Sequence, residues 1–167
     1  SWQPPLRSVL LGCGNDDGDH CLRISFRIKR DLLRSIHDFI GTDVQFGRLA
    51  KVRRQAERLH LPNIRLLHAE TAYTLQYLIP PASVSAAYLF FPDPWPKKRH
   101  HKRRLLKPGF VHELARRLAP GGYLHVATDW EDYAHEALAT LQAEPLLANT
   151  AADFAPRPAY RPLTKFE

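Results

Sequence analysis

One carboxylate and one indole, Asp93 and Trp95, lie on a proline-rich stretch that runs directly into a cationic block. Prolines at 92, 94 and 96 fix every second φ angle near −65° and remove three backbone donors, which predicts a rigid, extended loop from 90 to 104. Six of the chain's 24 lysines and arginines fall between 97 and 104. This combination is typical of a site for a nucleic-acid base, and a solvated charge run without a ligand is the alternative.

Asp93 is one of three acids that follow predicted strands. Asp43 ends the second strand and Glu70 the third, so with Asp93 they predict an acidic rim along one edge of a parallel sheet, where open α/β sheets hold ligands. From this position Asp43 can accept both hydroxyl protons of a ribose. A residue that caps the following helix is an equally good interpretation of Asp43, and Glu70 has the same ambiguity.

The first strand ends at a glycine turn, Gly12-Cys13-Gly14, which lets a ligand approach the backbone. Asp17 stands where a dinucleotide motif needs a third glycine, and with Asp16 it would repel a pyrophosphate. A cationic cofactor suits this loop better than a nicotinamide dinucleotide.

Strand and helix patterns alternate along the chain, which predicts an α/β fold: a doubly wound, mostly parallel sheet with helices on both faces. Glycine and proline residues mark where most of the predicted strands and helices end. We expect Asp129 to cap the last helix, whose buried apolar stripe ends at Leu141. Strands are predicted at 7–11, 38–44, 63–68, 84–91 and 123–128, and helices at 19–33, 48–61, 71–79 and 108–118.

The 167 residues suit a single domain, 1–167, and the net charge of +7 favours a polyanionic partner. Two cysteines without paired spacing support neither a disulfide framework nor a metal site, and no apolar run suggests a membrane segment or a signal peptide. We therefore expect a cytoplasmic protein, monomeric or homodimeric. Because it starts at Ser1 and lacks methionine, we also expect a fragment or a processed form.

Several segments together resemble the bacterial tRNA (guanine-N7)-methyltransferases, a branch of the class I S-adenosylmethionine-dependent methyltransferases. The resemblance spans nearly all of the chain, and its most specific parts are 90–104 and the final Thr164-Lys165-Phe166-Glu167. It also rests on 12–15, 39–44, 61–65, 118–122, 127–134 and 161–163. It implies a Rossmann-like domain, S-adenosylmethionine as cofactor and tRNA as partner. From the cysteine and histidine spacing we expect no metal.

The resemblance also implies roles for individual residues. Asp93 is the implied catalytic residue, and Gly12, Gly14, Asp43, Glu70 and Asp93 would hold the cofactor. Lys97, Asp129, Thr164, Lys165, Phe166 and Glu167 would contact the substrate nucleotide, whereas Arg99, His100, His101, Lys102, Arg103 and Arg104 would meet RNA. A carboxylate suits guanine because it offers two acceptors to N1–H and the 2-amino group, and Trp95 or Phe166 could stack on the base.

This sequence departs from the family in three places. Leu10 stands where the family carries an acid, Asp16-Asp17 displaces a glycine, and the stretch to Phe39 is longer than usual. The family also has an N-terminal extension and a final strand beyond Glu167, so we expect either a sheet without its antiparallel edge strand or a truncated sequence. An RNA-binding module that has lost its cofactor is the main alternative, and a nicotinamide oxidoreductase is a distant third.

Overall fold

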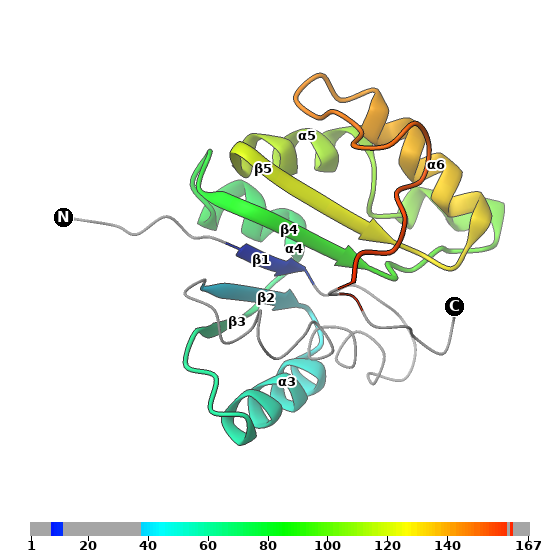
Figure 1. Ribbon diagram of the computed structural model, residues 1–167. Helices are drawn as coiled ribbons and strands as arrows, with labels where there is room; N and C mark the ends of the chain where they lie inside the picture. The colour runs from blue at the N-terminus through cyan, green and yellow to red at the C-terminus, as the bar shows by residue number, and fades with distance from the viewer. Residues whose placement is uncertain (1–7, 12–37, 160, 162–167) are drawn as a thin grey trace.

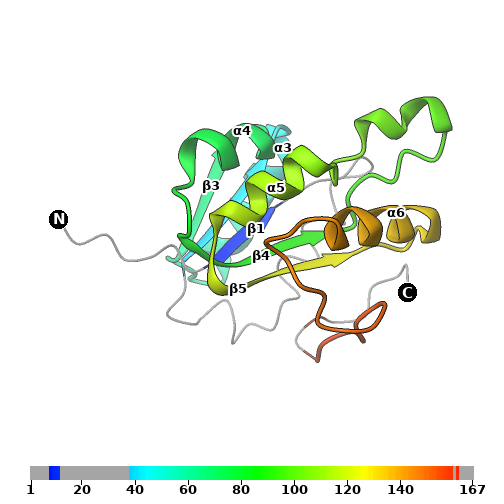
Figure 2. The same ribbon diagram turned by 90° about the horizontal axis from the view of Figure 1, so that it is seen from above.

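A computed structural model describes residues 8–11, 38–159 and 161, and Figures 1 and 2 show it from two sides. Five parallel strands form one sheet in the order β3-β2-β1-β4-β5. Their bounds are Ser8–Leu11 (β1), Phe39–Asp43 (β2), Ile64–His68 (β3), Val84–Phe90 (β4) and Leu118–Ala127 (β5). The predicted doubly wound, parallel α/β sheet is confirmed. The glycine turn after β1, the helix expected at 19–33 and the segment 164–167 lie outside the described residues.

The strand order reverses next to β1, which pairs with β2 on one side and with β4 on the other. Ligands of open parallel sheets bind outside the carboxyl ends of the strands at such a switch point. The loops that follow β1 and β4 are therefore the ones that this topology assigns to a ligand.

Helices flank the sheet on two sides, and Figure 1 shows α3 on the opposite side from α5 and α6. The three longer helices are α3 (Phe46–Arg58), α5 (Pro108–Arg117) and α6 (Glu131–Gln142). The shorter turns are α4 (Thr71–Tyr73), the π-helix η1 (Thr74–Leu78) and the 3₁₀ helix η2 (Lys98–Arg103). No helix among the described residues is long and apolar enough to cross a membrane.

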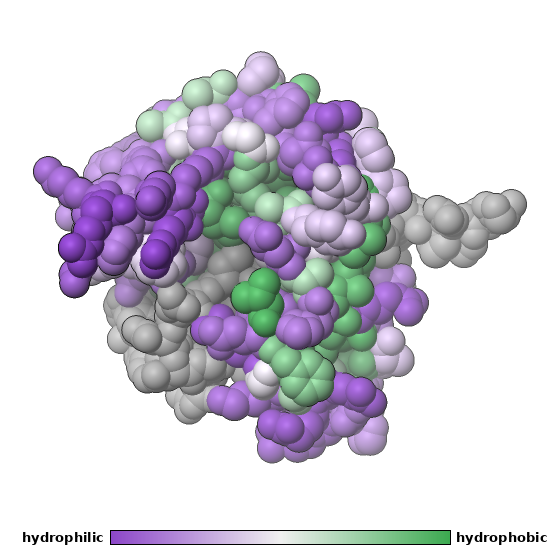
Figure 3. All heavy atoms as spheres, turned by 180° about the vertical axis from the view of Figure 1, so that it is seen from behind, coloured by the Kyte–Doolittle hydropathy of each residue, from purple (hydrophilic) through white to green (hydrophobic). Residues whose placement is uncertain are grey.

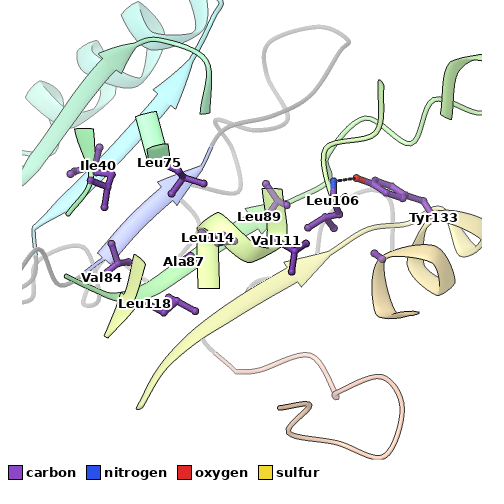
Figure 4. Close-up of a cluster of buried hydrophobic side chains, with 12 residues drawn as sticks. Ile40, Leu75, Val84, Ala87, Leu89, Leu106, Val111, Leu114, Leu118 and Tyr133 are labelled. Carbon is purple, nitrogen blue, oxygen red and sulfur yellow. Dashed lines mark hydrogen bonds between the residues drawn. The ribbon is translucent and has the colours of Figure 1, made fainter. Parts of the chain in front are cut away.

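Each side of the sheet has its own apolar core. The larger cluster packs β4 against α5 and α6, with Leu89, Val111 and Leu114 almost completely buried, and Figure 4 shows it extending to Tyr133 of α6. A smaller cluster on the α3 side contains Phe39, Ala56 and Leu61. Burying each leucine, valine or phenylalanine side chain in these clusters contributes about 1.5–3 kcal/mol, so the two clusters fix both helix layers on the strands that carry the candidate site.

The last strand begins earlier than predicted. The Pro120-Gly121-Gly122 turn was expected to precede a strand at 123–128, but β5 already starts at Leu118 and pairs with Val84 before a register shift. Gly121 has φ +77°, and a Cβ on Gly122 would lie 2.8 Å from the carbonyl oxygen of Ala119. The turn is therefore a bulge inside the strand, where glycine is needed because other backbone comes close.

Candidate active site and nucleic-acid interface

Four acids lie at the ends of four of the five strands, along the carboxyl edge of the sheet. Asp43 is the last residue of β2, whereas Glu70, Asp93 and Asp129 lie two or three residues beyond β3, β4 and β5. Because all the strands are parallel, these acids share one edge, and neighbouring strands lie about 4.8 Å apart. Asp43 and Asp93 follow the strands on the two sides of β1, so they flank the switch point.

Asp43 is buried, and its carboxylate is already oriented by its own loop. One oxygen accepts the backbone N–H of Gln45 at 2.7 Å, and the other lies 3.5 Å from Nη1 of Arg48. Gln45, not Asp43, precedes α3 at the N-cap position, and no side chain caps that helix. Each carboxylate oxygen has two lone pairs, so Asp43 can still accept hydroxyl protons from a bound ribose.

Glu70 is exposed and stands at the N-cap of α4, where its backbone carbonyl accepts both the N–H and the hydroxyl of Thr74. A buried hydrogen bond of 2.9 Å between the hydroxyls of Thr42 and Thr71 ties this helix start to β2. The side chain of Glu70 makes no cap hydrogen bond. The acid is thus held near the edge by its backbone, with its carboxylate directed to solvent.

Asp93 sits in a turn whose backbone is strained on both sides. Phe91 and Trp95 have φ angles of +51° and +45°, a left-handed region that costs a residue with a side chain about 1–2 kcal/mol. The half-buried Asp93 carboxylate accepts the N–H of Trp95 at 2.9 Å, and the N–H of Phe91 donates to Ala127 of β5 at 2.7 Å. These two bonds fix the carboxylate at the end of β4.

Arg104 holds this turn from the other side. Its Nε donates to the carbonyl oxygen of Pro94 at 2.8 Å, and its guanidinium also pairs with Glu136 of α6. The same group lies 3.0 Å from His101 Nε2 and 5.0 Å above the ring of Tyr133, whose hydroxyl accepts the N–H of Leu106 (Figure 4).

The position of Arg104 corrects one sequence-based prediction. The residue was expected to contact RNA, but it is only 3% exposed, and its charge is used within the protein. A guanidinium buried among these partners is unable to reach a phosphate, so Arg104 supports the Asp93 turn and is no part of an RNA surface.

The cationic block is also less extended than predicted. Residues 98–103 form the 3₁₀ helix η2, although the proline-rich part before it remains without helix. Arg103 lies 4.9 Å from the centre of the Trp95 ring, and His100 meets the same ring edge-on at 5.8 Å. One face of the half-buried Trp95 ring is therefore occupied by η2. The exposed cations of this segment are Lys97, Lys98, Arg99, Lys102 and Arg103.

Asp129 is exposed beyond β5, and its expected capping role is wrong. Trp130 holds the N-cap position of α6 without a side-chain cap, and its N–H donates to the hydroxyl of Thr128 at 3.2 Å. The Asp129 carboxylate is consequently not engaged at the helix start and faces solvent at the same edge as Asp93.

His125 is a notable residue that the sequence pattern did not single out. It lies on β5, packs edge-on against Phe90 at 4.9 Å, and borders a cavity of about 590 Å³ between β5, α6, the segment 149–158 and Arg161. Burial, and then the positive charge of Arg161, lower the pKa of His125 to about 4. Its ring is therefore neutral near pH 7, a property that no single-residue pattern reveals.

Comparison with solved structures identifies the fold. The fold matches a precorrin-6y C5,15-methyltransferase from Geobacter metallireducens with a TM-score of 0.56 at 15% identity, over 81% of this chain and 62% of the other. An rRNA methylase from Streptococcus thermophilus gives 0.54 at 16% identity, over 83% and 70%. At such low identity the likeness concerns the fold alone, and that fold is the Rossmann-like one of class I methyltransferases.

Sequence comparison gives the family. Residues 11–167 match a family model described as "Putative methyltransferase", and the chain belongs to that family. A tRNA (guanine-N(7)-)-methyltransferase of Nitrosospira multiformis is 51% identical over 131 residues, covering 78% of this chain and 57% of the relative. One of Bordetella pertussis is 50% identical over 136 residues, covering 81% and 54%. The predicted resemblance to these enzymes is confirmed, and the chain spans a little over half the length of these two relatives.

Proposed function

We propose that this protein transfers a methyl group from S-adenosylmethionine to N7 of a guanine in tRNA. The observation that carries this proposal is the turn after β4, where Asp93 is fixed at the switch point of the sheet and leads directly into the exposed cations of η2. A site for a small substrate has no need of such a cationic extension. The family and the named relatives support the same reaction.

The residues at the carboxyl edge fit an adenosyl cofactor. Asp43 is buried and fixed with unused lone pairs, as an acceptor for two ribose hydroxyls requires, and Glu70 stands at the neighbouring strand end. Gly12 and Gly14 would hold the remainder of the cofactor. When bound, S-adenosylmethionine supplies an electrophilic methyl group on a sulfonium centre.

The chain's own task in the reaction is to position the base and balance its charge. N7 of guanine has an unprotonated lone pair at neutral pH, so no general base is needed. Asp93 would accept hydrogen bonds from the Watson–Crick edge and stabilise the positive charge that develops on the base. Alignment of the reactants can contribute about 7–11 kcal/mol. Lys97, Asp129 and the segment Thr164 to Glu167 would complete the nucleotide site.

The exposed cations of the Asp93 loop would hold the RNA backbone. Lys97, Lys98, Arg99, Lys102 and Arg103 can neutralise phosphates, which gives salt-sensitive affinity without reading sequence. His100 and His101 are half-buried in the same turn, so their part is to shape η2 as much as to touch RNA.

The direct test is methylation of unmodified tRNA. The protein is incubated with tRNA and S-adenosylmethionine labelled on the methyl group, and the digested RNA is analysed for 7-methylguanosine. Labelled 7-methylguanosine is the expected product, and its absence would contradict the proposal. Thermal unfolding with S-adenosylhomocysteine separates the alternative: an RNA-binding module without a cofactor site would show no rise in Tm.

The role of Asp43 is tested by cofactor binding. Asp43→Asn should weaken binding of S-adenosylhomocysteine, measured by calorimetry, by tenfold or more, since a charge-assisted hydrogen bond is worth about 1.5–3 kcal/mol. Asp153→Asn changes an exposed acid outside the edge and serves as the matched control. Equal affinities for the two variants would remove Asp43 from the cofactor site.

A further inference from the structure

A second cationic surface lies on helix α3, away from the Asp93 loop. The helix carries five cations and a single acid. Figure 3 shows hydrophilic side chains over η2 at the left of the molecule and over α3 at the bottom. Among the described residues, the segment 97–104 and helix α3 thus each carry several exposed cations, and only the first of these two groups adjoins the proposed catalytic turn.

Three of the α3 cations form a stripe. Lys51, Arg54 and Arg58 are exposed and follow one another at intervals of three and four residues, so they share one face of the helix. At 100° per residue this face is opposite Leu49 and Ala56, which are buried against the sheet. With a rise of 1.5 Å per residue, the stripe is about 10 Å long.

The neighbouring Arg53 differs from Arg54 and Arg58 in its ion pairing. Its Nε donates to Glu57 at 2.9 Å, so its charge is balanced on the same helix. In the part of the chain that the structure describes, neither Arg54 nor Arg58 forms an ion pair. Like charges four residues apart destabilise a helix, so the stripe works against the stability of α3, although Arg58 in the last turn suits the helix dipole.

We propose that the stripe Lys51, Arg54 and Arg58 is a second RNA-binding surface that contacts backbone phosphates of the tRNA; this inference rests on the proposed function. Helix α3 starts three residues after Asp43, at the edge that carries the Asp93 turn. Strand β2 is separated from β4 only by β1, so their ends lie about 10 Å apart. A tRNA with a guanine at Asp93 is large enough to extend along α3.

The experiment measures tRNA binding without the cofactor, at several salt concentrations. The triple variant Lys51→Gln, Arg54→Gln and Arg58→Gln is compared with wild type and with Arg53→Gln as the matched control on the same helix. Each lost phosphate contact reduces the slope of log K against log salt by about 0.7–0.9. We expect the triple variant to lose about two units of slope, and Arg53→Gln to match wild type.

Two readouts separate the outcomes. Far-UV circular dichroism and Tm establish that the variants fold, which is expected because the replaced side chains are exposed. A folded triple variant that binds tRNA with the wild-type slope would overturn the inference, and so would an equal loss of slope in Arg53→Gln. If the triple variant shows the expected loss of slope while wild type makes no 7-methylguanosine, that result would contradict the proposed function but support the RNA-binding surface on α3.

Discussion

The guanidinium of Arg104 donates a hydrogen bond of 2.8 Å to the carbonyl oxygen of Pro94, ten residues earlier in the chain. Because the same guanidinium pairs with Glu136, the proline-rich turn is fastened to α6. We predict that Arg104→Gln lowers the kcat of methylation and leaves tRNA affinity within a few fold. Arg103→Gln, on the exposed side of η2, should instead weaken tRNA binding with little change in kcat. A loss of tRNA affinity without a loss of kcat in Arg104→Gln would instead indicate that Arg104 contacts RNA.

Glu136 provides a stability test of the same contact. Glu136→Ala leaves the buried charge of Arg104 without its carboxylate, and we expect a loss of about 2 kcal/mol in the free energy of unfolding, measured in urea. Glu131→Ala changes a 93% exposed side chain on the same helix and should cost less than about 1 kcal/mol. Similar losses for both variants would mean that the Arg104 pair contributes no more than a surface charge.

Asp93 has two functions that two substitutions can separate. Asp93→Asn keeps an oxygen for the N–H of Trp95 but removes the negative charge, whereas Asp93→Ala removes both. If charge stabilisation matters most, both variants should lose about 10²–10³-fold in kcat, with tRNA affinity within a few fold. Retained activity in Asp93→Asn would reduce the role of Asp93 to shaping the turn.

Gly122 tests the bulge that aligns β5 with β4. Gly122→Ala would place a Cβ 2.8 Å from one backbone oxygen and 3.1 Å from two others, so we expect a loss of about 1–3 kcal/mol in stability. Gly109→Ala in α5 meets no atom within 4 Å and should be neutral or stabilising by up to about 1 kcal/mol. Thermal unfolding of the two variants, side by side, checks the difference.

His125 makes stability depend on pH. Because burial and Arg161 lower its folded pKa to about 4, below the unfolded value of 6.5, the unfolded state binds more protons between these values. The contribution of neutral His125 to stability is fully present above about pH 6.5 and is lost as the pH drops towards 4. Between pH 7 and pH 5, we expect the free energy of unfolding to fall by about 1–2 kcal/mol less in His125→Gln than in wild type. Replacement of the exposed His135 by Gln should leave the wild-type pH dependence unchanged. Parallel curves for wild type and His125→Gln would contradict this.

The sequence predicted the sheet well because its strands are short apolar runs bounded by glycine, proline or an acid. Each predicted strand that lies within the described residues is present, and only the start of β5 shifts by several residues. That error has a physical cause: the Pro120-Gly121-Gly122 pattern fits a turn and a bulge equally, and the choice depends on pairing with Val84.

The sequence predicted those site residues whose positions depend on nearby residues in the chain. The acids at the strand ends follow from alternating strands and helices, and the structure places Asp43 and Asp93 on either side of β1. Arg104 was assigned wrongly because a cationic run looks alike in sequence whether its members face water or protein. Its burial depends on Glu136 and Tyr133, about 30 residues later, which no local pattern connects to it.

The positive φ angles of Phe91 and Trp95 have a consequence for protein engineering. Glycine would relieve the backbone strain of about 1–2 kcal/mol at each position, but it would also remove Phe91 from an apolar cluster and Trp95 from its contacts with Arg103 and His100. The same substitutions would give the backbone on either side of Asp93 new conformations and let its carboxylate drift. In this fold the usual replacement of a left-handed residue by glycine is therefore expected to lower stability and activity together.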